Sequence, residues 1–198
     1  MASTTVTITP GHHGGRPVDG TVGPVTLHVG CGPTKLEGSI GVDINSVSAA
    51  DVIHDLDCFP YPFPAESFER IVCDHVLEHL ADIPRVMEEL HRICTPEGRI
   101  EIRVPHFSSV HNFRDPTHRH SFGLRSFDYF IEGTELSRFG YSSRRFRLVH
   151  LELPPPAGAG IGKQLLYKLL NRYGDFYENR LAFILPRHLL YFQLTPVK

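Results

Sequence analysis

The chain has 198 residues, a formal net charge of −2 and 41% hydrophobic residues, which favours one globular α/β domain with an ordinary core. This charge gives no support to a generic binder of nucleic acid or anionic membranes, and no apolar run reaches the roughly 20 residues of a membrane span. The four cysteines form no CxxC pair, which favours reduced thiols in a cytoplasmic protein.

Charge is distributed unevenly along the chain. Residues 1–100 contain 6 Lys and Arg against 14 Asp and Glu, whereas residues 101–198 contain 14 against 8. A basic second half fits an acceptor molecule with a negative group, and charged surfaces facing solvent are the alternative explanation.

The predicted elements begin after the first two dozen residues. Residues 1–24 are rich in Thr, Gly, Pro and His without hydrophobic periodicity, which predicts a mobile leader before a single domain over 25–198. From Val25 onward, strand-like apolar runs alternate with helical or loop segments, as in a parallel sheet. Strands are predicted at 25–29, 39–43, 51–54, 69–74, 99–104, 145–152 and 188–195.

Three helices are predicted between these strands. The clearest covers 81–94, where Ile83, Val86 and Leu90 recur at three- and four-residue spacing. The aromatic segment 125–138 and the leucine-rich segment 163–184 are the others. The apolar stripe of the last helix fits the core, a lid, a homodimer interface or a membrane surface, and the pattern leaves these open.

The stretch 26–43 has the layout of a nucleotide site. An apolar run is followed by Gly30 and Gly32, and a second apolar run ends on Asp43. Glycines at the end of a strand let the backbone approach a ligand, and a carboxylate ending the next strand can accept from both hydroxyls of a ribose.

The connection between these two runs is unusually short. It spans only about ten residues, too few for a full helix with both turns. Because Pro33 and Gly38 lie within it, we expect one turn or a loop.

Together these motifs resemble the class I S-adenosylmethionine-dependent methyltransferases, particularly the small methyltransferase-11-like members. The resemblance implies a Rossmann-like α/β fold whose seven-stranded sheet has the order 3-2-1-4-5-7-6, with strand 7 antiparallel and helices on both faces. It also implies acceptor-side insertions at 105–140 and 155–187. The motifs that carry it are HVGCGP (28–33), GVDI (41–44), DVIHDLD (51–57), FPYPFPAESFERIVCDHVLEHL (59–80) and TPEGRIEIRVP (95–105).

The resemblance also implies S-adenosyl-L-methionine as the cofactor. Asp43 would hold the ribose, Ile44 would pack on the adenine, and the glycine turn would pass under the methionine. The chain departs from the family pattern at Pro33, where a third glycine is common, and at His28, where an acidic residue is common. The implied cofactor-binding residues are Gly30, Cys31, Gly32, Asp43, Ile44, Asp55, Leu56 and Asp74.

Histidines and arginines fill the segment 105–130, which the resemblance places beside the acceptor. Methyl transfer needs a base only when the nucleophile carries a proton, and histidine titrates in the right range. The predicted catalytic residues are His106 or His111, with His75 as a second choice. A packing role is the alternative for each of them.

The same segment contains residue types that ligate divalent metals. The spacing is not that of a standard metal site, and the neighbouring arginines repel cations, so a metal is not favoured. If one is bound, the predicted ligands are His106, His111, Asp115, His118 and His120.

We therefore expect an enzyme, an S-adenosylmethionine-dependent methyltransferase acting on an O or N nucleophile of a small metabolite that can be anionic. The alternatives are a metal-assisted lyase, cyclase or hydrolase on the same scaffold, and a non-catalytic cofactor-binding module. A nucleic-acid substrate is not expected, because the chain has no (D/N)PPY-type tetrapeptide.

Overall fold

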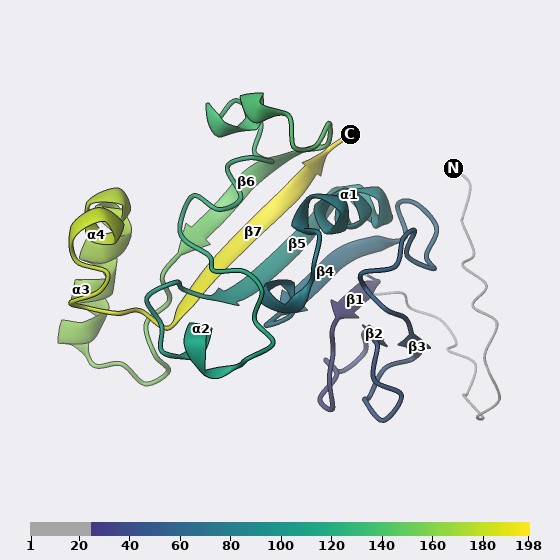
Figure 1. The fold of residues 1–198 in the computed structure, drawn as a ribbon, viewed down its shortest axis with the longest axis horizontal. Helices are drawn as coiled ribbons and strands as arrows, with labels where there is room; N and C mark the ends of the chain where they lie inside the picture. The colour runs from purple at the N-terminus through teal and green to yellow at the C-terminus, as the bar shows by residue number, and fades with distance from the viewer. Residues whose placement is uncertain (1–24) are drawn as a thin grey trace.

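The computed structural model describes residues 25–198, which form one mixed sheet flanked by helices (Figure 1). The predicted leader, 1–24, lies outside the described residues. The strands follow the order β3-β2-β1-β4-β5-β7-β6, with β7 antiparallel to both neighbours, so the predicted topology is confirmed. The strands of this sheet are β1 (Thr26–Val29), β2 (Ile40–Asp43), β3 (Val52–Ile53), β4 (Phe68–Asp74), β5 (Cys94–Pro105), β6 (Arg145–Glu152) and β7 (Leu189–Val197).

The helices are few and mostly short. Among the connections between the parallel strands, only the one from β4 to β5 contains an α-helix longer than one turn. The first crossover consists of turns, as predicted. In Figure 1, α3 and α4 lie together beyond the end of β6. The helices of the described chain are η1 (Leu77–His79), α1 (Ile83–Ile93), α2 (His111–Arg114), η2 (Leu136–Phe139), α3 (Ile161–Arg172) and α4 (Gly174–Arg180).

The helix α1 confirms the clearest helix prediction. It begins where the Asp82 side chain accepts a hydrogen bond from the Arg85 amide, with a proline in its first turn. It ends at Ile93, and β5 begins at the next residue, five positions earlier than predicted. Pro96 agrees with this boundary, because a proline disfavours helical backbone at the residue before it, here Thr95.

The predicted helix over 125–138 is wrong. Residues 124–130 form turns, and the only helix nearby is the short η2. The backbone of this segment pairs with β6 instead: Phe130 accepts from the Phe146 amide, and Phe146 accepts from the Glu132 amide. Phe127 meanwhile packs edge-on against Phe192 of β7, so tertiary pairing overrides the helical pattern.

The predicted helix over 163–184 is divided at Tyr173 into α3 and α4. A Cβ atom added to Gly174 would lie 2.6 Å from Leu124, so the close approach of the two segments requires a glycine there. The leucine stripe is also divided: Tyr167 and Leu170 are buried, while Leu165 is 67% exposed.

The hydrophobic core lies around the central strands and α1. Leu27, Ile71 and Ile102, from β1, β4 and β5, are fully buried, as are Val86 and Leu90 of α1. Burial on both faces explains the apolar run Ile71–Cys73 of β4, whereas β5 alternates buried Ile100 and Ile102 with the charged side chains of Glu101 and Arg103. All four cysteines are free thiols. None of the helices within residues 25–198 is long and apolar enough to cross a membrane.

The stability of this core should depend on pH through His28 of β1. The ring is 6% exposed, its Nδ1 accepts a hydrogen bond from the Leu36 amide at 3.2 Å, and burial lowers its pKa. The unfolded chain therefore takes up this proton more readily, and the free energy of unfolding should fall as pH drops below about 6.5.

Urea unfolding at about pH 7.5 and about pH 5.5 checks this expectation. His28→Asn keeps a short acceptor for the Leu36 amide but cannot titrate, so its loss of stability on acidification should be smaller than that of the wild type. An equal loss in both proteins would contradict the assignment to His28.

Candidate functional site

The carboxyl ends of the parallel strands meet at one cavity. Open α/β sheets bind ligands at this edge. The cavity has a volume of about 470 Å³, within the usual range for small-molecule sites. Its lining residues are Gly30, Asp43, Ile44, Asp55, Leu56, Asp57, His75, Val76, His79, Leu80 and Arg119. The predicted cofactor residues Cys31, Gly32 and Asp74 do not line this cavity.

The glycine turn after β1 has left-handed backbone at Gly30 and Gly32, with φ of 63° and 53°. A Cβ atom added to Gly30 would lie 2.4 Å from Cγ2 of Val76, whereas one added to Gly32 would meet nothing within 4 Å. Position 30 therefore requires glycine because of packing against the protein itself. Position 32 requires it only for the backbone conformation.

Asp43, at the end of β2, is tied to this turn. Its Oδ2 accepts from the Gly32 amide and its Oδ1 from the Asn45 amide, both at 2.8 Å. Each carboxylate oxygen has a further lone pair, so the group can still accept from two ligand hydroxyls. The next residue, Ile44, is 64% exposed and lines the cavity, so it offers an apolar surface beside the carboxylate.

The other wall of this cavity carries further acidic groups. The Asp55 carboxylate accepts from the Asp57 amide at 2.9 Å. Asp57 accepts from the Ala81 amide at 2.7 Å and pairs with Arg119 at 3.4 Å. Arg119 comes from the loop after α2, far along the chain, so sequence spacing gave no signal for its place here. A carboxylate at a strand end, an exposed apolar side chain and a second carboxylate fit a ribose, an adenine ring and its amino group.

A second cavity of about 470 Å³ adjoins the first. His75 and His79 line both cavities, so the two spaces meet at these side chains. Helix α2, which lies near the end of β5 (Figure 1), contributes His111 and Arg114 to the lining of the second cavity. Its lining residues are His75, Glu78, His79, Pro105, His111, Arg114, Asp115, His118, His188 and Leu189. We call this space the acceptor-side cavity.

His75 occupies a strained position at the end of β4. Its φ is 53°, which is uncommon for a residue other than glycine. Its amide donates to the Arg103 carbonyl, and its Nδ1 lies 3.1 Å from Oε1 of Glu78. The hydrogen bond to this carboxylate raises the pKa of His75.

The structure separates the two first-choice histidines. His111 lines the acceptor-side cavity, with its ring 5.6 Å from that of His188. His106 lines neither cavity: it is fully buried, with Nδ1 2.8 Å from the Ser108 hydroxyl and Nε2 3.1 Å from Glu178. Both nitrogens of His106 are engaged, so this geometry fits a residue that ties β5 to α4.

The predicted metal ligands are likewise divided. His111, Asp115 and His118 line the acceptor-side cavity, whereas His106 is held by Glu178. His120 is partly buried, and its Nε2 has no hydrogen-bond partner. The structure therefore does not assemble these five residues into one ligand set.

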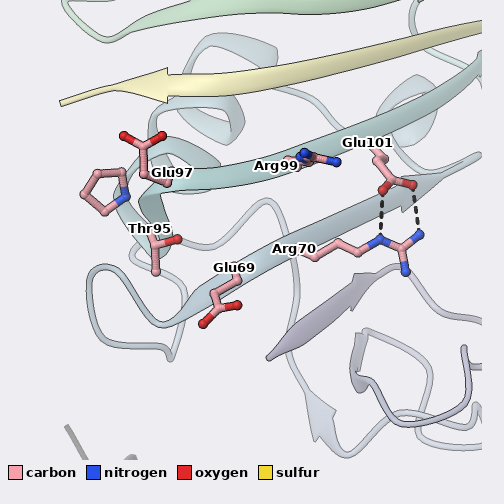
Figure 2. Close-up of a pocket in the computed structure, with 7 residues that line it drawn as sticks. Glu69, Arg70, Thr95, Glu97, Arg99 and Glu101 are labelled. Carbon is pink, nitrogen blue, oxygen red and sulfur yellow. Dashed lines mark hydrogen bonds and ion pairs between the residues drawn. The ribbon is translucent and has the colours of Figure 1, made fainter. Parts of the chain in front are cut away.

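A larger cavity, of about 640 Å³, lies at the opposite edge of the sheet. Figure 2 shows its lining residues at the beginnings of β4 and β5, with Arg70 bound to Glu101 by two hydrogen bonds of 2.8 and 2.9 Å. Because the amino ends of parallel strands are not where these sheets bind ligands, the first cavity is the better candidate despite its smaller volume.

Fold and site together define a Rossmann-like protein with two adjoining cavities at the carboxyl ends of its parallel strands. Residues 27–102 match the family model described as "Methyltransferase domain". A sequence search against curated proteins finds no match. The resemblance to class I S-adenosylmethionine-dependent methyltransferases is confirmed, and it rests on this part of the chain.

Solved structures agree on the fold. One is a protein in complex with the Haloferax volcanii Trm112 methyltransferase activator, at 14% identity and a TM-score of 0.56, covering 87% of this chain and 82% of that one. Another is an S-adenosylmethionine-dependent methyltransferase from Archaeoglobus fulgidus, at 18% and 0.51, covering 87% and 86%. A third is the [4+2]-cyclase SpnF, at 14% and 0.52, covering 87% and 74%. At these identities the likeness establishes the fold.

Proposed function

We propose that this protein is a methyltransferase that uses S-adenosyl-L-methionine to methylate an oxygen or nitrogen of a small acceptor. The observation that carries the proposal is the pair of cavities that meet at His75 and His79. One cavity has the acceptor and apolar groups that suit a nucleoside, and the other has the histidines and arginine that suit a small polar acceptor.

The chain's own residues would hold the cofactor in the first cavity. Asp43 would accept from the ribose hydroxyls, Ile44 would cover the adenine, and Asp55 with the Leu56 amide would bind its edge. The turn at Gly30, Cys31 and Gly32 would lie under the methionine, and Asp74 would face it. When bound, S-adenosylmethionine supplies an electrophilic methyl group.

The second cavity would align the acceptor. Methyl transfer is an in-line displacement, so alignment and exclusion of water provide much of the acceleration. His111 would take the proton of a hydroxyl or amine acceptor, with His75 as the second candidate, while His106 would position the loop. Arg114 lines the same cavity and would hold a carboxylate or phosphate of the acceptor. The cytoplasmic location remains a prediction, and a homodimer remains one of the open alternatives for the apolar stripe of the last helices.

A second candidate is a metal-assisted lyase, cyclase or hydrolase on this scaffold. The similarity in fold to a cyclase is the observation that favours this second candidate, because one fold can host several chemistries. Calorimetric titration with S-adenosylhomocysteine, before and after treatment with a chelator, separates the two. About micromolar binding that is indifferent to chelation supports the methyltransferase. No binding contradicts it.

His111→Ala should separate catalysis from cofactor binding. Because His111 lines only the acceptor-side cavity, we expect unchanged affinity for S-adenosylhomocysteine and about 100-fold slower turnover, the usual minimum for loss of a general base. Turnover is measured as S-adenosylhomocysteine release over a panel of small hydroxy acids and amines.

The matched control is His150→Ala, because His150 lies on β6 and lines neither cavity. It should change neither quantity. A large loss of cofactor affinity in His111→Ala would contradict its assignment to the acceptor-side cavity.

A further inference from the structure

Three side chains that could ligate a metal converge in the acceptor-side cavity. Glu78, His79 and His118 each place one ligand atom within 4.8 Å of the others. Glu78 and His79 belong to η1, directly after β4, while His118 comes from the loop after α2. This set shares only His118 with the one predicted from the sequence.

Glu78 is fully buried and only half satisfied. Its Oε1 accepts from Nδ1 of His75 at 3.1 Å, but its Oε2 is buried without any hydrogen-bond partner. A buried carboxylate oxygen without a partner is costly, and natural proteins rarely leave one. A cation beside Oε2 would remove this cost.

His79 is held in the tautomer that leaves Nε2 free. Its Nδ1 lies 2.8 Å from the Thr117 hydroxyl, and that hydroxyl donates to Asp115 Oδ1 at 2.7 Å. Because the hydroxyl has a single hydrogen, it can only accept from His79, so Nδ1 carries the proton. Nε2 of the neutral ring then has its lone pair available.

His118 has the same arrangement. Its Nδ1 lies 3.2 Å from the Asn112 carbonyl oxygen, which can only accept, so Nδ1 again carries the proton. The His79 and His118 rings stand nearly perpendicular, with centroids 4.7 Å apart. Histidines that bind metals characteristically donate their other N–H to a carbonyl or carboxylate in this way.

We propose that Glu78 Oε2 and the Nε2 atoms of His79 and His118 bind one first-row divalent cation, such as Zn²⁺, Fe²⁺ or Co²⁺. Two imidazoles and one carboxylate are a common ligand set for these ions. Three protein ligands leave coordination positions open, and these would face the acceptor-side cavity, where an oxygen of the acceptor can occupy them. Arg114 on the same cavity opposes a cation, and Asp115 offsets it.

Cobalt titration tests the proposal, because Co²⁺ gives a visible absorption band when it is bound by histidine and carboxylate. The full chain is used with His12 and His13 replaced by Ala, so that this histidine pair does not contribute. We expect one equivalent of Co²⁺ per chain. His118→Ala should weaken binding by at least about 100-fold, more than the 10- to 100-fold typical of losing an outer partner.

Two further variants sharpen the test. Thr117→Val removes the group that orients His79 and should weaken Co²⁺ binding by about tenfold. His188→Ala is the matched control, because His188 lines the same cavity but is not one of the three proposed ligands. This variant should retain the affinity for Co²⁺. Glu78→Gln should abolish binding, but a change at this buried residue can also disturb folding. The test therefore depends on the variant of the partly exposed His118.

The proposal is overturned if the chain binds no stoichiometric Co²⁺, if His118→Ala retains the affinity, or if His188→Ala loses it equally. Metal binding does not depend on methyl transfer. Titrating the same samples with S-adenosylhomocysteine therefore distinguishes the two proposals, since failure of one ligand to bind leaves the other measurement intact.

Discussion

Replacing Asp43 by Ala should weaken S-adenosylhomocysteine binding by tenfold or more. Asp43 lines the first cavity with both oxygens anchored by backbone amides, so it is held in place to accept from a ribose. Hydrogen bonds to a charged group contribute about 1.5–3 kcal/mol, which corresponds to roughly 10- to 100-fold in affinity. Isothermal titration calorimetry measures this directly.

Asp51→Ala is the matched control for this experiment. Asp51 also accepts from a backbone amide, that of Gly41, and pairs with Lys35, but it does not line the cavity. Its replacement should leave affinity for S-adenosylhomocysteine within about twofold. Unchanged affinity in Asp43→Ala would remove the ribose assignment, and an equal loss in both variants would indicate general damage to the sheet edge.

Gly30→Ala should cause the largest loss of stability. The new side chain would occupy left-handed backbone, which costs about 1–2 kcal/mol. It would also lie 2.4 Å from Val76, and such overpacking costs typically a further 1–3 kcal/mol. Urea unfolding measures the total loss in the free energy of unfolding.

The chain offers a way to separate the two costs. Gly32→Ala has the same backbone penalty but meets no neighbouring atom within 4 Å, so it should lose only about 1–2 kcal/mol. Adding Gly30→Ala to a Val76→Ala background should cost less than adding it to the wild type, because the closest atom, Cγ2 at 2.4 Å, is removed and only Cβ of residue 76, at 2.7 Å, remains. Equal losses for the two glycine variants would mean that the contact with Val76 has no energetic consequence.

Much of the sheet could be predicted because its signals are local. Strands buried on both faces appear as apolar runs, and α1 appears as a repeat at three and four residues with Pro84 in its first turn. The glycine turn and Asp43 follow from the same logic, since a residue that ends a parallel strand lies at the edge where ligands bind. The cavity at this edge was accordingly expected.

The acceptor side could not be predicted to the same extent. The aromatic segment 125–138 has a helical pattern, yet pairing between Phe130 and Phe146 holds it in turns. Among the candidate bases, nothing in the sequence distinguished His111, which faces a cavity, from His106, which is buried against Glu178 across 72 positions of sequence.

The sequence by itself determined where the strands lie, the short first crossover and the turn that presents Asp43, while the strand order came from the family resemblance. Only the tertiary structure decided that His118 meets Glu78 and His79, and that Arg119 reaches the first cavity, the one lined by Asp43. The physical reason is that backbone period and turn chemistry are set by neighbours in sequence, whereas these contacts depend on how a long loop packs over a distant strand end.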